Sequence, residues 1–94
     1  MNRAEFEAAL DAEGYHEIVD RRMEKGAFNP EHAHEFEARL LVLEGEMTIL
    51  CEGEEKTYRS GQAFAMKAGC LHSERSGPEG VRYLAGRRYA KEGR

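Results

Sequence analysis

The feature that most constrains this chain is the regular recurrence of glycine and turn signals after Tyr15. From that residue onward the apolar positions lose helical spacing, and short runs with β-branched and aromatic side chains alternate with turns. Short strands at such regular spacing predict an all-β barrel or sandwich. The expected strands cover residues 15–25, 39–43, 46–51, 56–59, 62–66, 71–75 and 81–89, and the expected turns include 44–45, 52–55, 60–61 and 77–80.

The residues before Tyr15 predict a short helix. Asn2 can cap it, Glu5 follows three residues later as in a capping box, and Phe6 and Leu10 share one apolar face. Gly14 can end the helix, since glycine readily adopts the backbone conformation of a helix C-terminus. We therefore expect a helix within residues 1–14, a barrel over about 15–89 and a flexible tail over 91–94, all in a single domain.

Length and charge narrow the classes of function. The 94 residues suffice for one domain with one core, and the net charge is −4 with both signs interspersed. The only local gathering of positive charge is near the end, at Arg87, Arg88, Lys91 and Arg94. Because phosphate binding needs a concentrated positive face, we expect no nucleic-acid partner.

The hydropathy pattern predicts no membrane association. No apolar run approaches the roughly 20 residues that a membrane-spanning helix needs. The opening stretch, MNRAEFEAALDAEG, is acidic and interrupted, unlike an export signal, so we expect a cytoplasmic location. In that reducing compartment Cys51 and Cys70 are expected to remain thiols and to act as small buried residues.

Three of the four histidines have a spacing that indicates a shared site. His32 and His34 stand two residues apart, so on a strand both side chains point to the same face. His72 follows a second glycine-marked segment. Three imidazoles on one barrel wall would suit a divalent transition metal and leave positions open for water or a substrate. The alternative is that they are partly buried, hydrogen-bonded residues of the barrel.

The glycines around these histidines resemble the two motifs of small single-domain cupins. The first motif is matched by Gly26, five residues and then His32 and His34, and it ends at Gly45. The second motif is matched by Gly61, five residues, the segment 67–69 and then His72. Fifteen residues separate Gly45, the end of the first motif, from Gly61. The resemblance covers about residues 15–89. It implies a jelly-roll barrel of two facing antiparallel sheets, with Fe, Mn, Ni, Zn or Co bound inside by the three histidines, and a homodimer.

The chain departs from the family motifs at three positions. Lys67 stands in place of a proline and Ser76 in place of an asparagine, and both changes are tolerable near a turn. Ala38 stands where the family has a glutamate ligand.

Strand alternation frames the question of a fourth ligand. Residues 32, 34, 36 and 38 share one face of a regular strand, which predicts that Ala38 faces the metal and leaves an open three-histidine site. Glu37 would reach inward only through a β-bulge. Glu74, two residues after His72 and in phase with it, is a second candidate, and either carboxylate is a candidate to move protons in catalysis.

Other residues have a less specific interpretation. Arg39, Arg75 and Arg82 could anchor an anionic ligand at the barrel mouth, although exposed structural arginines are the more common case. The aromatic residues at strand positions, Tyr58, Tyr83 and Phe64, are expected to belong to the core.

Two functions of different classes are compatible with this sequence. One is a metalloenzyme, such as a dioxygenase, isomerase or hydrolase, that acts on a small polar or anionic molecule at the three-histidine site. The other is a non-catalytic module that binds or senses a metabolite in the same pocket without an essential metal. A jelly-roll fold does not decide between them, because one fold hosts many functions.

Overall fold

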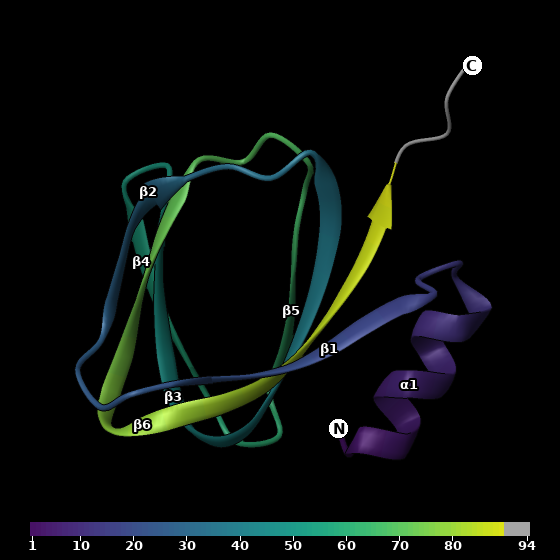
Figure 1. The fold of residues 1–94 in the computed structure, drawn as a ribbon, viewed down its shortest axis with the longest axis horizontal. Coiled ribbons are helices and arrows are strands. Elements are labelled where there is room, and N and C mark those ends of the chain that lie inside the picture. Colours follow the sequence, from purple (N-terminus) through teal and green to yellow (C-terminus); the bar gives the residue numbers. More distant parts are fainter. Residues whose placement is uncertain (90–94) are drawn as a thin grey trace.

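Within residues 1–89 the fold consists of one helix and six strands (Figure 1). The structure, a computed structural model, describes residues 1–89. The all-β fold with a short N-terminal helix is confirmed, and the tail expected over 91–94 lies outside the described residues. The elements are α1 (Arg3–Ala12), β1 (Glu17–Met23), β2 (Phe28–His32), β3 (Phe36–Cys51), β4 (Glu54–Arg59), β5 (Ala63–Met66) and β6 (His72–Tyr89).

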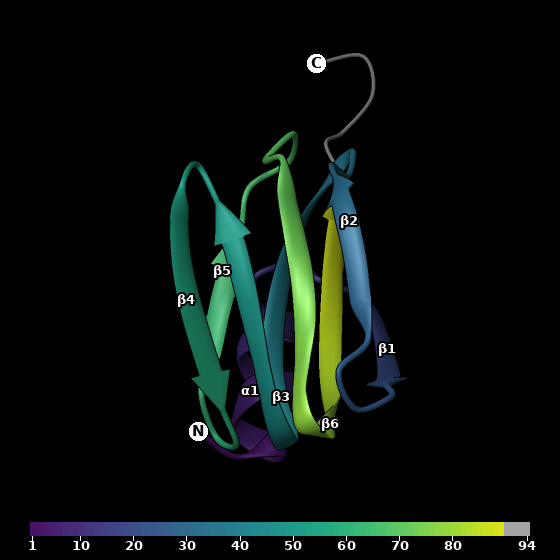
Figure 2. The same ribbon diagram turned by 90° about the vertical axis from the view of Figure 1, so that its left-hand side faces the viewer.

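The long strands β3 and β6 form the centre of the fold and belong to both of its sheets. Every pairing is antiparallel. The end of β6 pairs with β1 and with the start of β3, which also pairs with β5; we call this the β1 sheet. The start of β6 pairs with β2 and with the end of β3, which also pairs with β4; we call this the β2 sheet. Figure 2 shows the β2 sheet face on, and Figure 1 shows both sheets facing each other across the barrel interior.

Two predicted chain breaks are bends within strands instead. The turn expected at 44–45 lies inside β3, and the loop expected at 77–80 lies inside β6. Gly45 has a φ of 78°, and a Cβ at this position would overlap the carbonyl oxygen of Gly80. Gly45 pairs with Val81 and Met47 with Ser76, so residues 77–80 stand opposite one residue of β3. The glycines therefore mark a bulged corner at which both strands turn together rather than end.

Helix α1 covers the outer face of the β1 sheet. The predicted capping box is present, since the Asn2 side chain accepts from the Glu5 amide and the Glu5 side chain accepts from the Asn2 amide. Phe6 and Leu10 are fully buried and pack with Tyr15, Leu41 and Leu84 in an outer core. Burial of the apolar face, more than intrinsic propensity, stabilises a helix of only 10 residues.

The barrel interior forms a second, separate core. Its buried members come from both sheets and include Ala38, Leu40, Val42, Met47, Ile49, Val81 and Tyr83. Since alternate residues of a strand face opposite sides, the β1 sheet supplies one set of side chains to this inner core and another to the outer core under α1. The described residues include no helix with the length and apolar character of a membrane span.

Candidate metal centre

The three predicted histidines meet one another inside the barrel, together with Glu74. One donor atom from each of His32, His34, His72 and Glu74 lies within 4.8 Å of the corresponding atoms of the others. His32 ends β2, His34 follows in the connection to β3, and His72 and Glu74 begin β6. The group therefore lies where β2 and β6 pair, with His32 and His72 directly opposite each other.

Backbone carbonyls orient two of the imidazoles. The Nδ1 of His72 lies 3.0 Å from the carbonyl oxygen of Cys70, and the Nδ1 of His32 lies 2.7 Å from that of Pro30. A carbonyl only accepts, so each Nδ1 carries the hydrogen and donates it, which leaves the lone pair of the neutral ring on Nε2. The Nε2 of His72 lies within hydrogen-bond distance of Glu74. Both Nε2 atoms lie on the side of Glu74, 3.2 Å (His72) and 3.9 Å (His32) from its Oε2. Such outer hydrogen bonds are typical of histidines that bind metals.

Glu74 is held in the cluster by a neighbouring amide. It is 6% exposed, and its Oε1 accepts a hydrogen bond of 2.9 Å from the Nδ2 of Asn29, its partner in the β2–β6 ladder. A buried carboxylate is costly unless it is paired with donors or a cation. Asn29 fixes one oxygen, and the other oxygen remains directed at the imidazoles.

His34 is held by an aromatic stack. Its ring lies on that of Phe36, with centroids 4.6 Å apart and an interplanar angle of 16°. Burial lowers the pKa of His34, and the nearby His32 and His72 lower it further. Both effects favour the neutral ring, which is the form that binds metal ions.

The two residues considered for a fourth ligand on β3 face opposite ways. Ala38 packs in the inner core of the barrel at 4% exposure, although residues 32–38 do not form the one regular strand that was expected. Glu37 points outward, where its carboxylate pairs with Arg88, so no bulge turns it toward the histidines. The carboxylate of the cluster comes from β6 rather than from β3.

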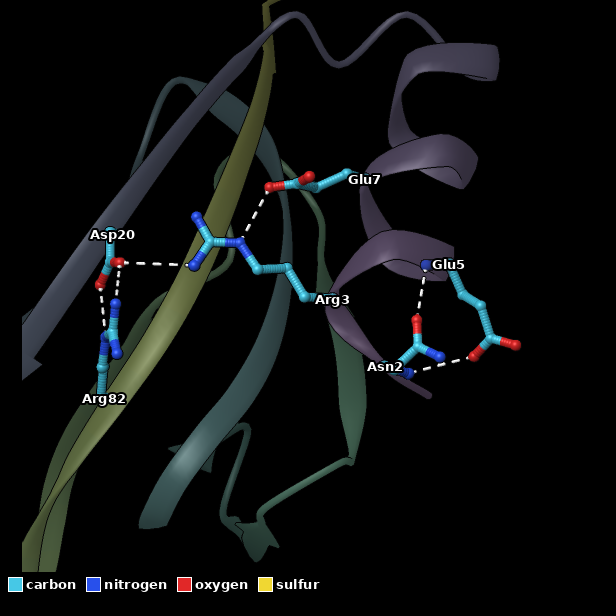
Figure 3. A network of polar contacts seen from close by, with 6 residues as sticks. All are labelled: Asn2, Arg3, Glu5, Glu7, Asp20 and Arg82. Atoms are coloured by element: carbon cyan, nitrogen blue, oxygen red, sulfur yellow. Dashed lines mark hydrogen bonds and ion pairs between the residues drawn. The ribbon is translucent and has the colours of Figure 1, made fainter.

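The arginines expected to anchor a ligand lie outside the barrel interior. Arg39 pairs with Glu13 and Arg75 with Glu55. Arg82 pairs with Asp20 at 2.7 Å in a surface network that Arg3 joins from the start of α1 (Figure 3). None of the three lines the cavity beside the histidines.

The cavity beside the cluster has a volume of about 370 Å³ and contains polar residues that the sequence interpretation missed. Its walls are His32, His34 and Glu74 at one end, apolar side chains from three strands, and two arginines, Arg21 and Arg87. Tyr83, expected in the core, also lines it. Strand alternation could have indicated both arginines. Arg21 lies two residues before Met23 and Arg87 four residues after Tyr83, and both Met23 and Tyr83 face the inner core.

The donor set fits a divalent transition metal. Ligand nitrogens and oxygens lie about 2.0–2.2 Å from such an ion, so two ligands of one ion are at most about 4.4 Å apart. The 4.8 Å spread of the cluster is close to that limit. Three imidazoles and one carboxylate form a mixed set that suits Mn, Fe, Co, Ni and Zn, and this group could hold one of them.

Comparison with known proteins agrees with this geometry. Residues 19–85 match the family model for the cupin domain, which is more than half of the chain. The chain belongs to the cupin family. No curated protein matches it.

Several solved structures have the same fold as this cupin. An RmlC-like cupin from Shewanella frigidimarina is 27% identical, with a TM-score of 0.69 over 80% of this chain and 67% of the other. KdgF from a Halomonas species is 24% identical, with a TM-score of 0.64 over 76% and 67%. A variant of oxalate decarboxylase from Bacillus subtilis is 19% identical, with a TM-score of 0.71 over 77% of this chain and 20% of the other. The cupin described here thus matches only a fifth of the decarboxylase chain.

Proposed function

We propose that this cupin binds one divalent transition metal through His32, His34, His72 and Glu74, and binds a small polar or anionic molecule in the adjoining cavity. The observation that supports the proposal is that donor atoms of four side chains lie within 4.8 Å of one another. In two of these side chains, His32 and His72, the Nδ1 atom already donates to a backbone carbonyl. A related fold is known to hold metal, since the oxalate decarboxylase of Bacillus subtilis has Mn(II) centres.

The residues of the chain have distinct roles in this proposal. The three imidazoles donate neutral nitrogen lone pairs, and Glu74 supplies a negative charge whose position Asn29 fixes. Apolar side chains such as Phe36, Leu40 and Met66 form part of the cavity wall. When bound, the metal would supply Lewis acidity toward an oxygen of the small molecule. If the chain is an enzyme, Glu74 is the carboxylate in the cluster that could accept or return a proton there.

Elemental analysis of protein purified without a polyhistidine tag tests the metal site. We expect close to one divalent transition metal per chain, and none after His32, His34 and His72 are all changed to alanine. His16→Ala is the matched control, because His16 is exposed and lies outside the cluster. Protein that stays empty after incubation with manganese, iron, nickel and zinc would rule the site out.

A pair of glutamate variants tests the fourth ligand. Glu74→Gln should weaken metal binding by about tenfold or more, since even supporting groups of a metal site contribute 10–100-fold to affinity. Glu37→Gln should leave the affinity unchanged, because Glu37 faces away and pairs with Arg88. Equal metal affinity in the two variants, measured by competition with a chelator, would exclude Glu74 as a ligand.

A further inference from the structure

Arg87 is held over the cavity by a stack of rings that leads to the metal cluster. Its Cζ lies 4.7 Å from the centroid of the Phe36 ring, and Phe36 in turn stacks on His34. A guanidinium over an aromatic face keeps its edge, with the N–H donors, free for another partner. Arg87 therefore lines the same cavity as the histidines and is separated from them by the Phe36 ring.

Arg21 reaches the same cavity from the neighbouring strand. It pairs in register with Tyr83, whose side chain also lines the cavity. Burial raises the pKa of Tyr83 and the charge of Glu74 raises it further, whereas the charges of Arg21 and Arg87 lower it. Both guanidinium charges thus act on a buried phenol that also experiences the charge of Glu74.

Among the residues that the structure describes, Arg21 and Arg87 lack the carboxylate partners that most other arginines have. Within residues 1–89, Arg3, Arg39, Arg59, Arg75, Arg82 and Arg88 each pair with a glutamate or aspartate. Neither Arg21 nor Arg87 makes an ion pair with any residue in that range. Arg22 also has no ion pair among these residues, but it lines a different hollow at the bulged corner.

The remaining walls indicate what kind of anion would fit. Phe36, Leu40, Met66 and Ala85 give the cavity an apolar side between the arginines and the histidines. A small inorganic anion would leave that apolar surface in contact with water. An organic acid would cover it with a short hydrocarbon body while its carboxylate meets the guanidinium groups, which bind carboxylates with two parallel hydrogen bonds.

We infer that Arg21 and Arg87 form a carboxylate-binding subsite, and that the molecule bound in the cavity is a small organic acid with its carboxylate on the arginines and its apolar body along Phe36, Leu40 and Met66. This inference rests on the proposed function for the metal at the other end of the cavity. The subsite itself consists of residues that do not bind the metal. The two ideas can therefore fail separately.

Titration of zinc-loaded protein with butyrate, followed by NMR, tests the subsite. Wild-type protein should bind butyrate more tightly than butyramide, its uncharged match, and more tightly than inorganic phosphate. Arg21→Gln and Arg87→Gln should each weaken butyrate binding by about tenfold, the usual scale for one hydrogen bond to a charged group. Arg22→Gln should change it less than about twofold, and Arg87→Lys should fall between, because lysine keeps the charge but loses the planar fork.

Zinc content, measured by elemental analysis in every variant, separates the possible failures. Full zinc content with butyrate affinity unchanged by either glutamine variant would overturn the subsite and leave the metal site intact. Phosphate binding that is tighter than butyrate binding would overturn the organic-acid assignment. If wild-type protein binds neither zinc nor manganese, iron or nickel, the metal proposal fails. The same titration on metal-free protein still decides the subsite: loss of butyrate binding in the variants supports it, and unchanged binding overturns it.

Discussion

Replacing Gly86 with alanine should destabilise the wild-type protein, which has Leu10. In a Leu10→Ala variant the same replacement should stabilise the protein. Gly86 lies in the β1 sheet and faces α1, and a Cβ built on it would overlap the Cδ1 of Leu10, with Cγ and Cδ2 at 3.5 and 3.6 Å. Leu10 is fully buried in the outer core, so its side chain cannot easily move away. The backbone of Gly86 has no positive φ, so alanine itself is compatible with the strand.

The magnitudes follow from two opposing effects. An added methyl in a well-packed core costs about 1–3 kcal/mol. Replacing glycine by alanine at a compatible backbone position restricts the unfolded chain and stabilises by about 0.4–1 kcal/mol. The two ranges leave a net cost of about 0–2.6 kcal/mol, so near their midpoints Gly86→Ala alone should lower the free energy of unfolding by about 1.3 kcal/mol, or the melting temperature by roughly 5–10 °C in a domain of this size. Leu10→Ala removes the overlapping atom, so in that background the same change should raise stability by about 0.4–1 kcal/mol.

Urea unfolding of the wild type, the two single variants and the double variant gives this coupling directly. Leu10→Ala alone should cost about 2–5 kcal/mol. Ile49→Val is the control background, since Ile49 belongs to the inner core on the other side of the sheet, and Gly86→Ala should cost the same there as in the wild type. If Gly86→Ala destabilises the Leu10→Ala protein as much as the wild type, the proposed packing of α1 on the strand is incorrect.

Three further predictions concern the barrel and its assembly. Ala38→Glu should lower the melting temperature of the metal-free protein, because it buries a carboxylate in the inner core, and added metal should restore part of the loss by binding the new oxygen; a shift that metal does not change would refute this. The hydrogen bond that the Cys51 thiol donates to Cys70, together with burial, raises the pKa of Cys51 to about 11. The Cys51 thiol should therefore react slowly with a disulfide reagent at pH 8 and faster as pH rises toward that value; rapid labelling of Cys51 at pH 8 would contradict it. The protein should be a homodimer that pairs through α1 or β1, because a barrel of this length leaves strand edges unpaired, and a monomer in light scattering at micromolar concentrations would argue against that.

The members of the candidate cluster fall in two short segments of the sequence, which is why their spacing pointed to a shared site. Glu74 is two residues from His72 on the same strand, so these two side chains share a face. His34 lies after the end of β2, so strand alternation does not explain its position beside His32. The same rule also applied to Arg39 and Arg75. Arg39 is out of phase with Ala38 and Leu40, and Arg75 is out of phase with His72 and Glu74, so alternation alone would have placed both outside.

Alternation failed where the strands bend. In β6 the inward residues before the corner are even-numbered (72, 74 and 76), and those after it are odd-numbered (81, 83, 85 and 87). The bulge at 77–80 changes the phase, and the length of a bulge depends on how two strands meet at a corner rather than on any local residue preference. If the alternation of inward and outward residues continued unchanged through the bulge in β6, Arg82 would point inward and Arg87 outward. The structure has the reverse. β3 changes phase in the same way at Gly45, from even positions through Val42 to odd positions from Met47.

The phase change in β6 also connects the two proposed halves of the site. Before the corner the inner face of this strand carries His72 and Glu74, and after it Tyr83 and Arg87. One continuous strand thus supplies metal donors to one end of the cavity and an anion-binding group to the other, and its hydrogen bonds to β3 fix their separation. A positive metal at the first end adds to the field of Arg21 and Arg87, since without it the acidic residues Glu31 and Glu74 balance those two charges. Metal and carboxylate should therefore strengthen each other's binding, and by thermodynamic reciprocity the factor must be the same in both directions. Butyrate affinity that is equal in zinc-loaded and zinc-free protein would show that the two ends act independently.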